Sequence, residues 1–306
     1  MDFCEKQFTK RKPLVINKDP KLTYGVQKFL MKKAYKFVRT QMGGKSKDIS
    51  TREISIKDEI INGYEDPITV RVYKPVEEKI RPVMVFCHGG GWVGGTIDVT
   101  HDYCKAVSDF ADCVVVSVDY HLAPEKKYPV GLEDAYAAIK WTLNNKERLQ
   151  IDEKQLIVSG DSAGGNLSVA LCFMAHDRQE FEIAKQILLY PAVSIDHTNS
   201  KYKIEKNLLL DGFSELYLPS EDLRGARYIS PFAQPNLENL PPVLITVGTH
   251  DFLFNQVFRF AKRLDEAGNS VRFVLYKNID HAFVDNTGYC PYAEDFIKEV
   301  SRFINN

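Results

Sequence analysis

Short apolar segments that alternate with longer helical segments constrain the fold of this chain more than any other feature. These segments are rich in valine, isoleucine and leucine without polar alternation, which is typical of strands buried on both faces of a parallel sheet. The apolar segments cover 82–89, 113–120, 155–162, 185–193, 241–249 and 271–278, and the expected helices cover 99–111, 130–145, 163–175, 254–267 and 292–304. The pattern predicts an α/β fold with a mostly parallel sheet flanked by helices.

Two strands of a different kind precede this series. The segments ISIKDEII and ITVRVYKP follow one another from about residue 52, and Asn62-Gly63 supplies the turn between them. We expect an antiparallel pair here, which brings the predicted sheet to about eight strands. The last apolar segment, 271–278, is then expected at an open sheet edge that needs cover, which favours a possible homodimer.

Two parts of the chain fall outside the series. Residues 22–42 place apolar side chains at helical spacing with lysines and arginines between them, which predicts an amphipathic helix. Residues 196–229 hold no clear strand. We therefore expect an α/β core of residues 46–195 and 230–306, with a small helical cap made of residues 1–45 and the insertion 196–229.

Charge and cysteine usage exclude several functional classes. The 40 basic and 41 acidic residues leave a net charge of -1, which argues against a dedicated nucleic-acid binder. The six cysteines form no CxxC pair, so a disulfide framework or a zinc site is a poor interpretation and a reducing compartment a better one. The N-terminal residues lack the apolar stretch of a signal peptide, and no segment approaches the ~18 apolar residues that span a bilayer. We expect a cytoplasmic protein without membrane insertion.

A candidate nucleophile follows the apolar segment 155–162. Residues 160–165 read GDSAGG and fit the motif G-x-S-x-G between a strand and a helix. The glycines are needed because side chains at these positions would collide with the adjacent helix and strand, while Ser162 adopts a strained backbone conformation. The alternative is a glycine-rich structural turn, but the strand before it and the helix after it favour a nucleophile.

A second glycine-rich stretch follows the segment 82–89. His88 is followed by Gly89, Gly90 and Gly91, and consecutive glycines let backbone N–H groups converge without obstruction by Cβ atoms. Together with the amide of Ala163, two such donors could stabilise the oxyanion of an acyl-transfer reaction. Alone the stretch could be a mere loop; beside the nucleophile motif, the oxyanion interpretation is favoured.

A serine nucleophile needs a base and an orienting carboxylate. His281 follows the last predicted strand and Asp251 follows the strand before it, so both side chains can reach the tips of the sheet. The order Ser162, Asp251, His281 is that of an α/β-hydrolase. His250 and Asp280 are neighbours that could be confused with these residues, and the register relative to the strand end favours Asp251 over Asp280.

Taken together, these motifs resemble the hormone-sensitive-lipase-like family of α/β-hydrolases, which includes carboxylesterases and arylacetamide deacetylases. The matching elements are HGGGW at 88–92, DYHLAPE at 119–125, GDSAGGN at 160–166, SPF at 230–232, LPPVLITVGTHDFL at 240–253 and DHAF at 280–283. The resemblance implies an α/β-hydrolase fold with a cap. It also implies Ser162 as nucleophile, Asp251 as orienting acid, His281 as base, and Gly90, Gly91 and Ala163 as oxyanion donors, with Gly89 helping the turn.

This chain departs from the family pattern at two positions. The family usually has arginine where His121 stands, so the sequence does not show which ion pair this loop forms. It usually has glycine after the catalytic histidine, where this chain has Ala282. We expect the single added methyl group to be tolerated.

The expected function is hydrolysis of small, short-chain carboxylic esters through an acyl-serine intermediate. This chemistry requires no metal and no organic cofactor, and the expected partner is a small-molecule ester. Two alternatives stay open at this point. An amide or sugar deacetylase, or a formamidase, would use the same three residues, and a non-catalytic binder of the same fold would keep the pocket but should lack the base.

Overall fold

The computed structural model describes residues 1–9, 25, 29, 33, 35–37, 39–40, 42–199, 201–202 and 204–306. Most of the helix predicted over 22–42 lies outside these described residues. The described positions 35–37, 39 and 40 are helical.

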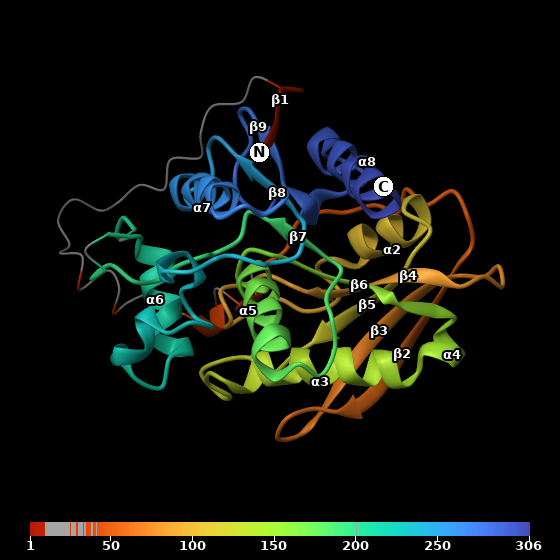
Figure 1. Cartoon of the computed structure of the whole chain (residues 1–306), viewed down its shortest axis with the longest axis horizontal. Coiled ribbons are helices and arrows are strands. Elements are labelled where there is room, and N and C mark those ends of the chain that lie inside the picture. The colour runs from red at the N-terminus through yellow and green to blue at the C-terminus, as the bar shows by residue number, and fades with distance from the viewer. Residues whose placement is uncertain are drawn as a thin grey trace.

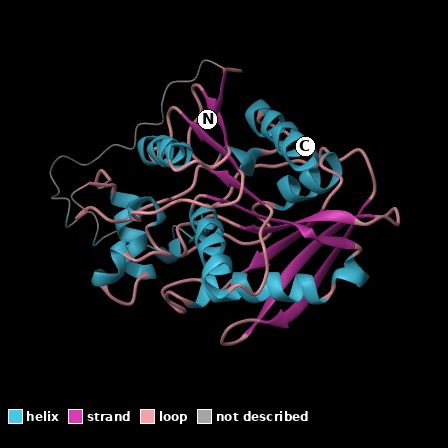
Figure 2. Cartoon of the chain, in the orientation of Figure 1, coloured by secondary structure: helices cyan, strands magenta, loops and turns pink. Residues whose placement is uncertain are grey.

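A nine-stranded sheet crosses the molecule and carries helices on both faces (Figures 1 and 2). Its order is β1-β9-β8-β7-β6-β4-β5-β3-β2. β2 pairs antiparallel with β3 and β3 with β5, and all other neighbours are parallel. The strands are β1 (Asp2–Lys6), β2 (Ile54–Asn62), β3 (Pro67–Pro75), β4 (Arg81–Cys87), β5 (Val114–Asp119), β6 (Ile151–Asp161), β7 (Lys185–Leu189), β8 (Val243–Gly248) and β9 (Val271–Tyr276). The predicted α/β fold with an antiparallel start is confirmed.

The helices pack against the sheet in two layers. α2 and α8 contact each other on one face, and α3 and α5 contact each other on the other (Figure 1). The α-helices are α2 (His101–Phe110), α3 (Val130–Asn144), α4 (Lys146–Leu149), α5 (Ala163–Arg178), α6 (Leu208–Tyr217), α7 (Phe254–Glu266) and α8 (Pro291–Asn305). Short 3-10 helices are η1 (Glu221–Gly225), η2 (Pro231–Ala233) and η3 (Phe283–Asn286).

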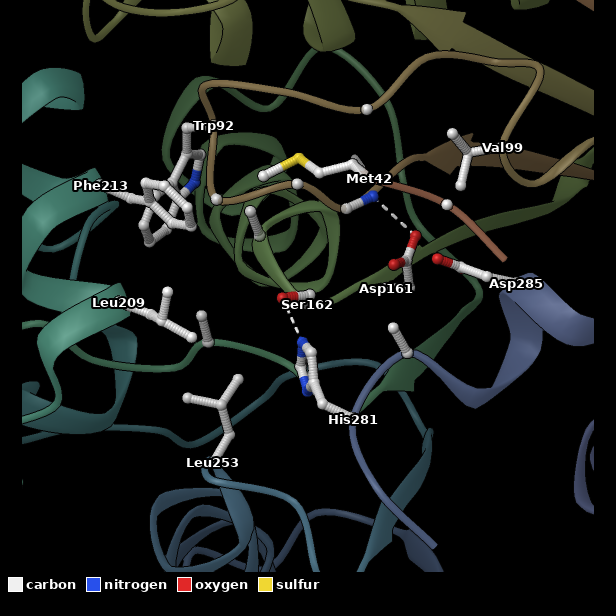
Figure 3. Close-up of a pocket in the computed structure, with 18 of the residues that line it drawn as sticks. Met42, Trp92, Val99, Asp161, Ser162, Leu209, Phe213, Leu253, His281 and Asp285 are labelled. Carbon is white, nitrogen blue, oxygen red and sulfur yellow. Dashed lines mark hydrogen bonds between the residues drawn. The ribbon is translucent and has the colours of Figure 1, made fainter. Parts of the chain in front are cut away.

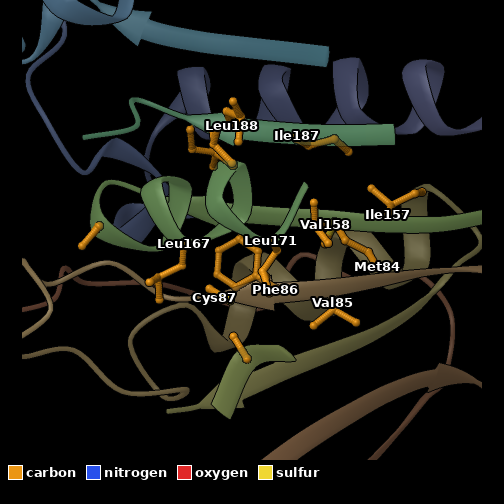
Figure 4. Packing of buried hydrophobic residues seen from close by; sticks show 14 of the residues in the cluster. Met84, Val85, Phe86, Cys87, Ile157, Val158, Leu167, Leu171, Ile187 and Leu188 are labelled. Carbon is orange, nitrogen blue, oxygen red and sulfur yellow. The ribbon is translucent and has the colours of Figure 1, made fainter. Parts of the chain in front are cut away.

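The central strands are buried along their apolar runs, as their sequence predicts. All six residues of β8 are buried, and β6 is buried from Leu156 to its end. Leu167 and Leu171 of α5 lie over the side chain of Phe86 on β4 (Figure 4). Each such buried side chain contributes roughly 1.5–3 kcal/mol to folding. This packing fixes α5, and therefore its first residue, relative to the strands.

Parallel pairing places the carboxyl ends of four strands at the same end of the sheet. Cys87 at the end of β4 pairs with Gly160 of β6, and Gly248 at the end of β8 pairs with Tyr276 at the end of β9. The loops that leave these strands begin side by side. They carry all the candidate site residues predicted from the sequence.

The ninth strand corrects two predictions. β1 pairs in parallel with β9, with Cys4 opposite Val274, so β9 is not the open edge that the sequence suggested. Lys6 Nζ donates to carboxylate oxygens of Asp295 and Glu299 on α8, both at 2.6 Å. The sequence analysis grouped residues 2–6 with the cap because DFCEK is charged and only partly buried, yet these residues extend the sheet.

A buried arginine at the start of β4 yields a stability prediction. Arg81 is fully buried, and its Nε donates to Asp112 at 2.9 Å; Arg52 and Lys79 also donate to Asp112. Burial alone would raise the pKa of Asp112, but the hydrogen bonds from Lys79, Arg81 and Arg52 hold it well below its ordinary value. This carboxylate therefore contributes its full stabilisation above the unfolded-state pKa of about 3.9, and the contribution decreases progressively as the pH falls from there towards the lower folded-state pKa.

Asp112→Asn is expected to lower the free energy of unfolding by about 2–3 kcal/mol at pH 7, because it leaves the Arg81 guanidinium buried with a weaker partner. Urea denaturation at pH 7 and pH 3.5 measures the effect, which should shrink at the lower pH. The control is Glu78→Gln, a change at an exposed carboxylate in the same loop. A loss of equal size at both pH values would contradict the role assigned to the charge.

All six cysteines are free thiols, and all except Cys4 are buried. Within the described residues, none of the helices has the length and apolar character required to cross a membrane.

Candidate active site

Ser162 occupies a sharp turn between β6 and α5. Its backbone has φ +53° and ψ −113°, a strained conformation for a residue with a side chain. The turn requires glycine at position 164, because an added Cβ there would lie 1.9 Å from the carbonyl oxygen of Cys87. The close approach of helix and strand that the motif predicts is present.

The structure brings Ser162, His281 and Asp251 into one hydrogen-bonded chain (Figure 3 shows its first link). His281 Nε2 lies 2.8 Å from Ser162 Oγ, and His281 Nδ1 lies 2.7 Å from Asp251 Oδ2. Asp251 is 5% exposed, and its Oδ1 accepts a hydrogen bond from the amide of Leu253 at 2.7 Å. The carboxylate beside the imidazole is thus Asp251, as the register argument predicted.

The backbone after His281 explains why glycine is usual at the next position. Ala282 adopts φ +60° and ψ +34°, the left-handed region. An alanine there costs roughly 1–2 kcal/mol relative to glycine. The imidazole is held in place by ring contacts with Tyr190, at 4.7 Å between centroids, and with Phe252, at 4.6 Å.

Gly90, Gly91 and Ala163 line the same pocket as Ser162. Within the described part of the chain, none of their backbone N–H groups has a hydrogen-bond acceptor. Gly90 has φ +119°, and an added Cβ would lie 2.2 Å from the carbonyl oxygen of Gly94, so only glycine fits this turn. The loop thus leaves amide donors available next to the serine hydroxyl.

His88 and Gly89 hold the base of this loop. His88 is fully buried, stacks on Tyr120 at 4.4 Å, and its Nδ1 lies 2.8 Å from the carbonyl oxygen of Gly89. Burial lowers the pKa of His88, so the ring is neutral at pH 7. The amide of Gly89 donates to Asp161 Oδ1 at 2.7 Å.

The pocket that contains these groups has a volume of about 410 Å³ and a mainly apolar lining. Two regions outside the sheet contribute to it. Met42, Gly43 and Gly44 come from the N-terminal part of the chain, and Leu209, Leu210 and Phe213 come from α6. Figure 3 shows Phe213 beside Trp92, on the side of the pocket away from Asp285.

Comparisons with known proteins agree with this architecture. Residues 84–285 match the sequence profile of a family described by its alpha/beta hydrolase fold. The chain belongs to the hormone-sensitive-lipase-like family of α/β-hydrolases. It is 32% identical to the esterase LipI of Mycobacterium tuberculosis, over 79% of each chain, and 32% identical to an arylesterase of Saccharolobus solfataricus, over 76% of this chain and 77% of that one.

Solved structures extend this similarity across almost the whole hydrolase. A hyperthermophilic esterase of the archaeon Pyrobaculum calidifontis superposes with a TM-score of 0.76 at 30% identity, covering 94% of this chain and 93% of that one. The carboxylesterase EstE1 from a metagenomic library superposes with a TM-score of 0.77 at 27% identity, covering 92% of this chain and 97% of that one.

Two pocket residues of this hydrolase were missed by the sequence analysis. Asp161 was part of the quoted motif but received no role, and Asp285 lies four positions after His281 in η3. Both are buried carboxyl groups, at 4% and 9% exposure. The sequence offers one signal for Asp161, its place directly before the nucleophile, and none for Asp285.

A buried carboxylate of α3 holds the loop after β5 in place. Asp134 of α3 is fully buried and accepts hydrogen bonds from His121 Nδ1 at 2.7 Å and from the amide of Tyr64 at 2.8 Å. The family usually has arginine at position 121. In this chain His121 stands there, and its ring contacts Asp134. This carboxylate ties two neighbouring loops of the hydrolase together.

Proposed function

We propose that this hydrolase is a serine carboxylesterase that cleaves small, short-chain esters through an acyl-serine intermediate. Ser162 is the nucleophile, His281 the base and Asp251 the orienting acid. Gly90, Gly91 and Ala163 donate to the oxyanion, while His88 and Gly89 support their loop. The observation that carries the proposal is the hydrogen-bonded chain from Asp251 through His281 to Ser162, beside amides that have no acceptor among the described residues. The esterases among its relatives support the same reaction class.

The geometry gives each group a step in the reaction. His281 Nε2 accepts the Ser162 hydroxyl proton as Oγ attacks the carbonyl carbon, and the carbonyl oxygen becomes an oxyanion facing the amides of the oxyanion donors. The bond to the alcohol oxygen then breaks, and His281 delivers its proton to the departing alcohol. Water repeats the sequence on the acyl-enzyme. Asp251 stays ionised and stabilises the imidazolium.

We propose a cap from residues 1–45 and 196–229 over a core of 46–195 and 230–306. Its support is that Met42 and three residues of α6 line the pocket. Because β1 already belongs to the sheet, the cap part of the N-terminal segment begins after residue 6. The pocket volume of about 410 Å³ falls at the small end of ligand pockets, roughly 300–1,000 Å³, which favours short acyl chains.

A substrate panel tests this proposal. The 4-nitrophenyl esters of acetate, butyrate and palmitate are compared by kcat/KM, and we expect butyrate to exceed palmitate by at least about tenfold, because a long chain cannot be buried in this pocket. The matching 4-nitroanilides form the second arm, and we expect esters to be turned over faster. A preference for palmitate would defeat the short-chain proposal, and faster anilide cleavage would point to the deacetylase alternative.

We also propose a cytoplasmic location and no nucleic-acid partner. Six free cysteines are consistent with a reducing compartment, and a net charge of -1 offers no attraction to a polyanion.

A homodimer stays a proposal as well. Since β1 covers β9, pairing through the sheet would use β1 or β2, which are the strands at its two ends.

A further inference from the structure

Two buried carboxyl groups that the reaction does not use face each other in the wall of the pocket (Figure 3). Asp161 lies at the end of β6, directly before the nucleophile, and Asp285 lies in η3. We call these two residues the carboxyl pair. Their exposed fractions of 4% and 9% leave little room for water to solvate a charge.

The contacts of the two carboxyl groups differ. Asp161 Oδ1 accepts the Gly89 amide at 2.7 Å, which connects the pair to the oxyanion loop. Asp285 Oδ1 is buried and has no hydrogen-bond partner among the described residues. No lysine or arginine is among the residues lining the pocket. Two ionised carboxylates in such a place would repel each other with no lysine or arginine to compensate.

Burial and the neighbouring charges favour the state in which the carboxyl pair carries one proton and one negative charge. Burial raises the pKa of Asp285 well above its ordinary value, and the neighbouring Asp161 raises it further. Burial also raises the pKa of Asp161, to about 6, while the Gly89 amide and His281 act in the opposite direction. Tyr190 is the other titratable group that feels both carboxyl groups, and it is neutral. Near neutral pH, Asp161 is therefore the ionised partner and Asp285 the protonated one.

We propose that Asp285 is a positioning residue: as a neutral carboxylic acid it shares its proton with Asp161, which in turn holds the Gly89 amide and the oxyanion loop. The shared proton keeps one negative charge, rather than two, next to the place where the oxyanion forms. Since an oxyanion exists only during the reaction, a misplaced loop lowers kcat more than it raises KM. This inference rests on the proposed acyl transfer at Ser162.

A matched pair of variants tests the role of the proton. In Asp285→Asn the carboxamide N–H₂ replaces the acid O–H as donor to Asp161, whereas Asp285→Leu has nearly the same shape and no donor. With 4-nitrophenyl butyrate we expect D285N to keep kcat within about threefold of wild type. We expect D285L to lose about 10- to 100-fold in kcat with KM within threefold. The rate of Ser162 labelling by a fluorophosphonate should fall in parallel, because phosphonylation uses the same amides.

Two outcomes would overturn the proposal. If D285L keeps the kcat of wild type, the loop does not depend on Asp285. If D285N loses as much kcat as D285L, an ionised carboxylate is required at this position, as for binding a cationic group of the substrate.

Thermal unfolding checks that the variants are folded, and Asp285→Ala replaces D285L should the leucine not be accommodated. If wild type is labelled at Ser162 but cleaves no ester, the proposed function fails while the labelling rates still test the carboxyl pair.

Discussion

Ser162→Ala is expected to lower kcat for 4-nitrophenyl butyrate by about 10⁴-fold or more, with little change in stability. The substitution removes the Oγ atom that lies 2.8 Å from His281 Nε2, and the residues that line the pocket include no second hydroxyl or thiol side chain. The activity that is left comes from the oxyanion donors and from binding alone. Steady-state kinetics with active-site titration of the wild type give the ratio directly.

Ser168→Ala is the matched control for this variant. Ser168 is buried on α5, the helix that follows Ser162, and its Oγ donates to the carbonyl oxygen of Gly164 at 2.9 Å, so its loss is structural. A fluorophosphonate should label wild type and S168A at Ser162, as read by mass spectrometry, and should leave S162A unlabelled. An S162A enzyme with more than a tenth of the wild-type rate, or a label on another residue, would contradict the assignment. A folded wild type that is not labelled would favour the non-catalytic binder.

Gly164→Ala is expected to reduce kcat by on the order of 100-fold and the free energy of unfolding by about 3 kcal/mol. The added Cβ would lie 1.9 Å from the Cys87 carbonyl oxygen and 2.5 Å from its carbonyl carbon, and these are backbone atoms of a central strand. Since they belong to the packed sheet, α5 must move away, and the turn that carries Ser162 moves with it.

Gly268→Ala, at the turn after α7, is the control that separates the steric clash at position 164 from the general cost of replacing a glycine. Gly268 has φ +84°, and an added Cβ there meets no atom within 4 Å, so the variant carries backbone strain without a clash. We expect it to lose about 1 kcal/mol of stability and no activity. Urea denaturation and kinetics on both variants separate the two effects. Equal losses of kcat in G164A and G268A would refute the steric explanation of the nucleophile turn.

The residues around the nucleophile show why local sequence predicted so much of the site. The strain at Ser162 and the close approach of Gly160 to Gly164 are set within a few residues of chain. A strand followed by a helix is also visible as a change of pattern. His281 and Asp251 were placed at the sheet tips because parallel strands end together. What the motif could not predict is the wall of the pocket, because Met42, Phe213 and Asp285 reach it from three distant segments.

The α/β class, the order of the central elements and the place of the candidate nucleophile could all be predicted from the chain's residues alone. Each of these follows from local sterics or from burial on both faces, which leave a periodic pattern in the chain. The pairing of β1 with β9 and the position of Asp285 beside Asp161 became apparent only in the three-dimensional arrangement. An edge strand half open to solvent needs no apolar run, and a carboxyl group acquires its unusual environment only when segments 124 positions apart fold into one wall.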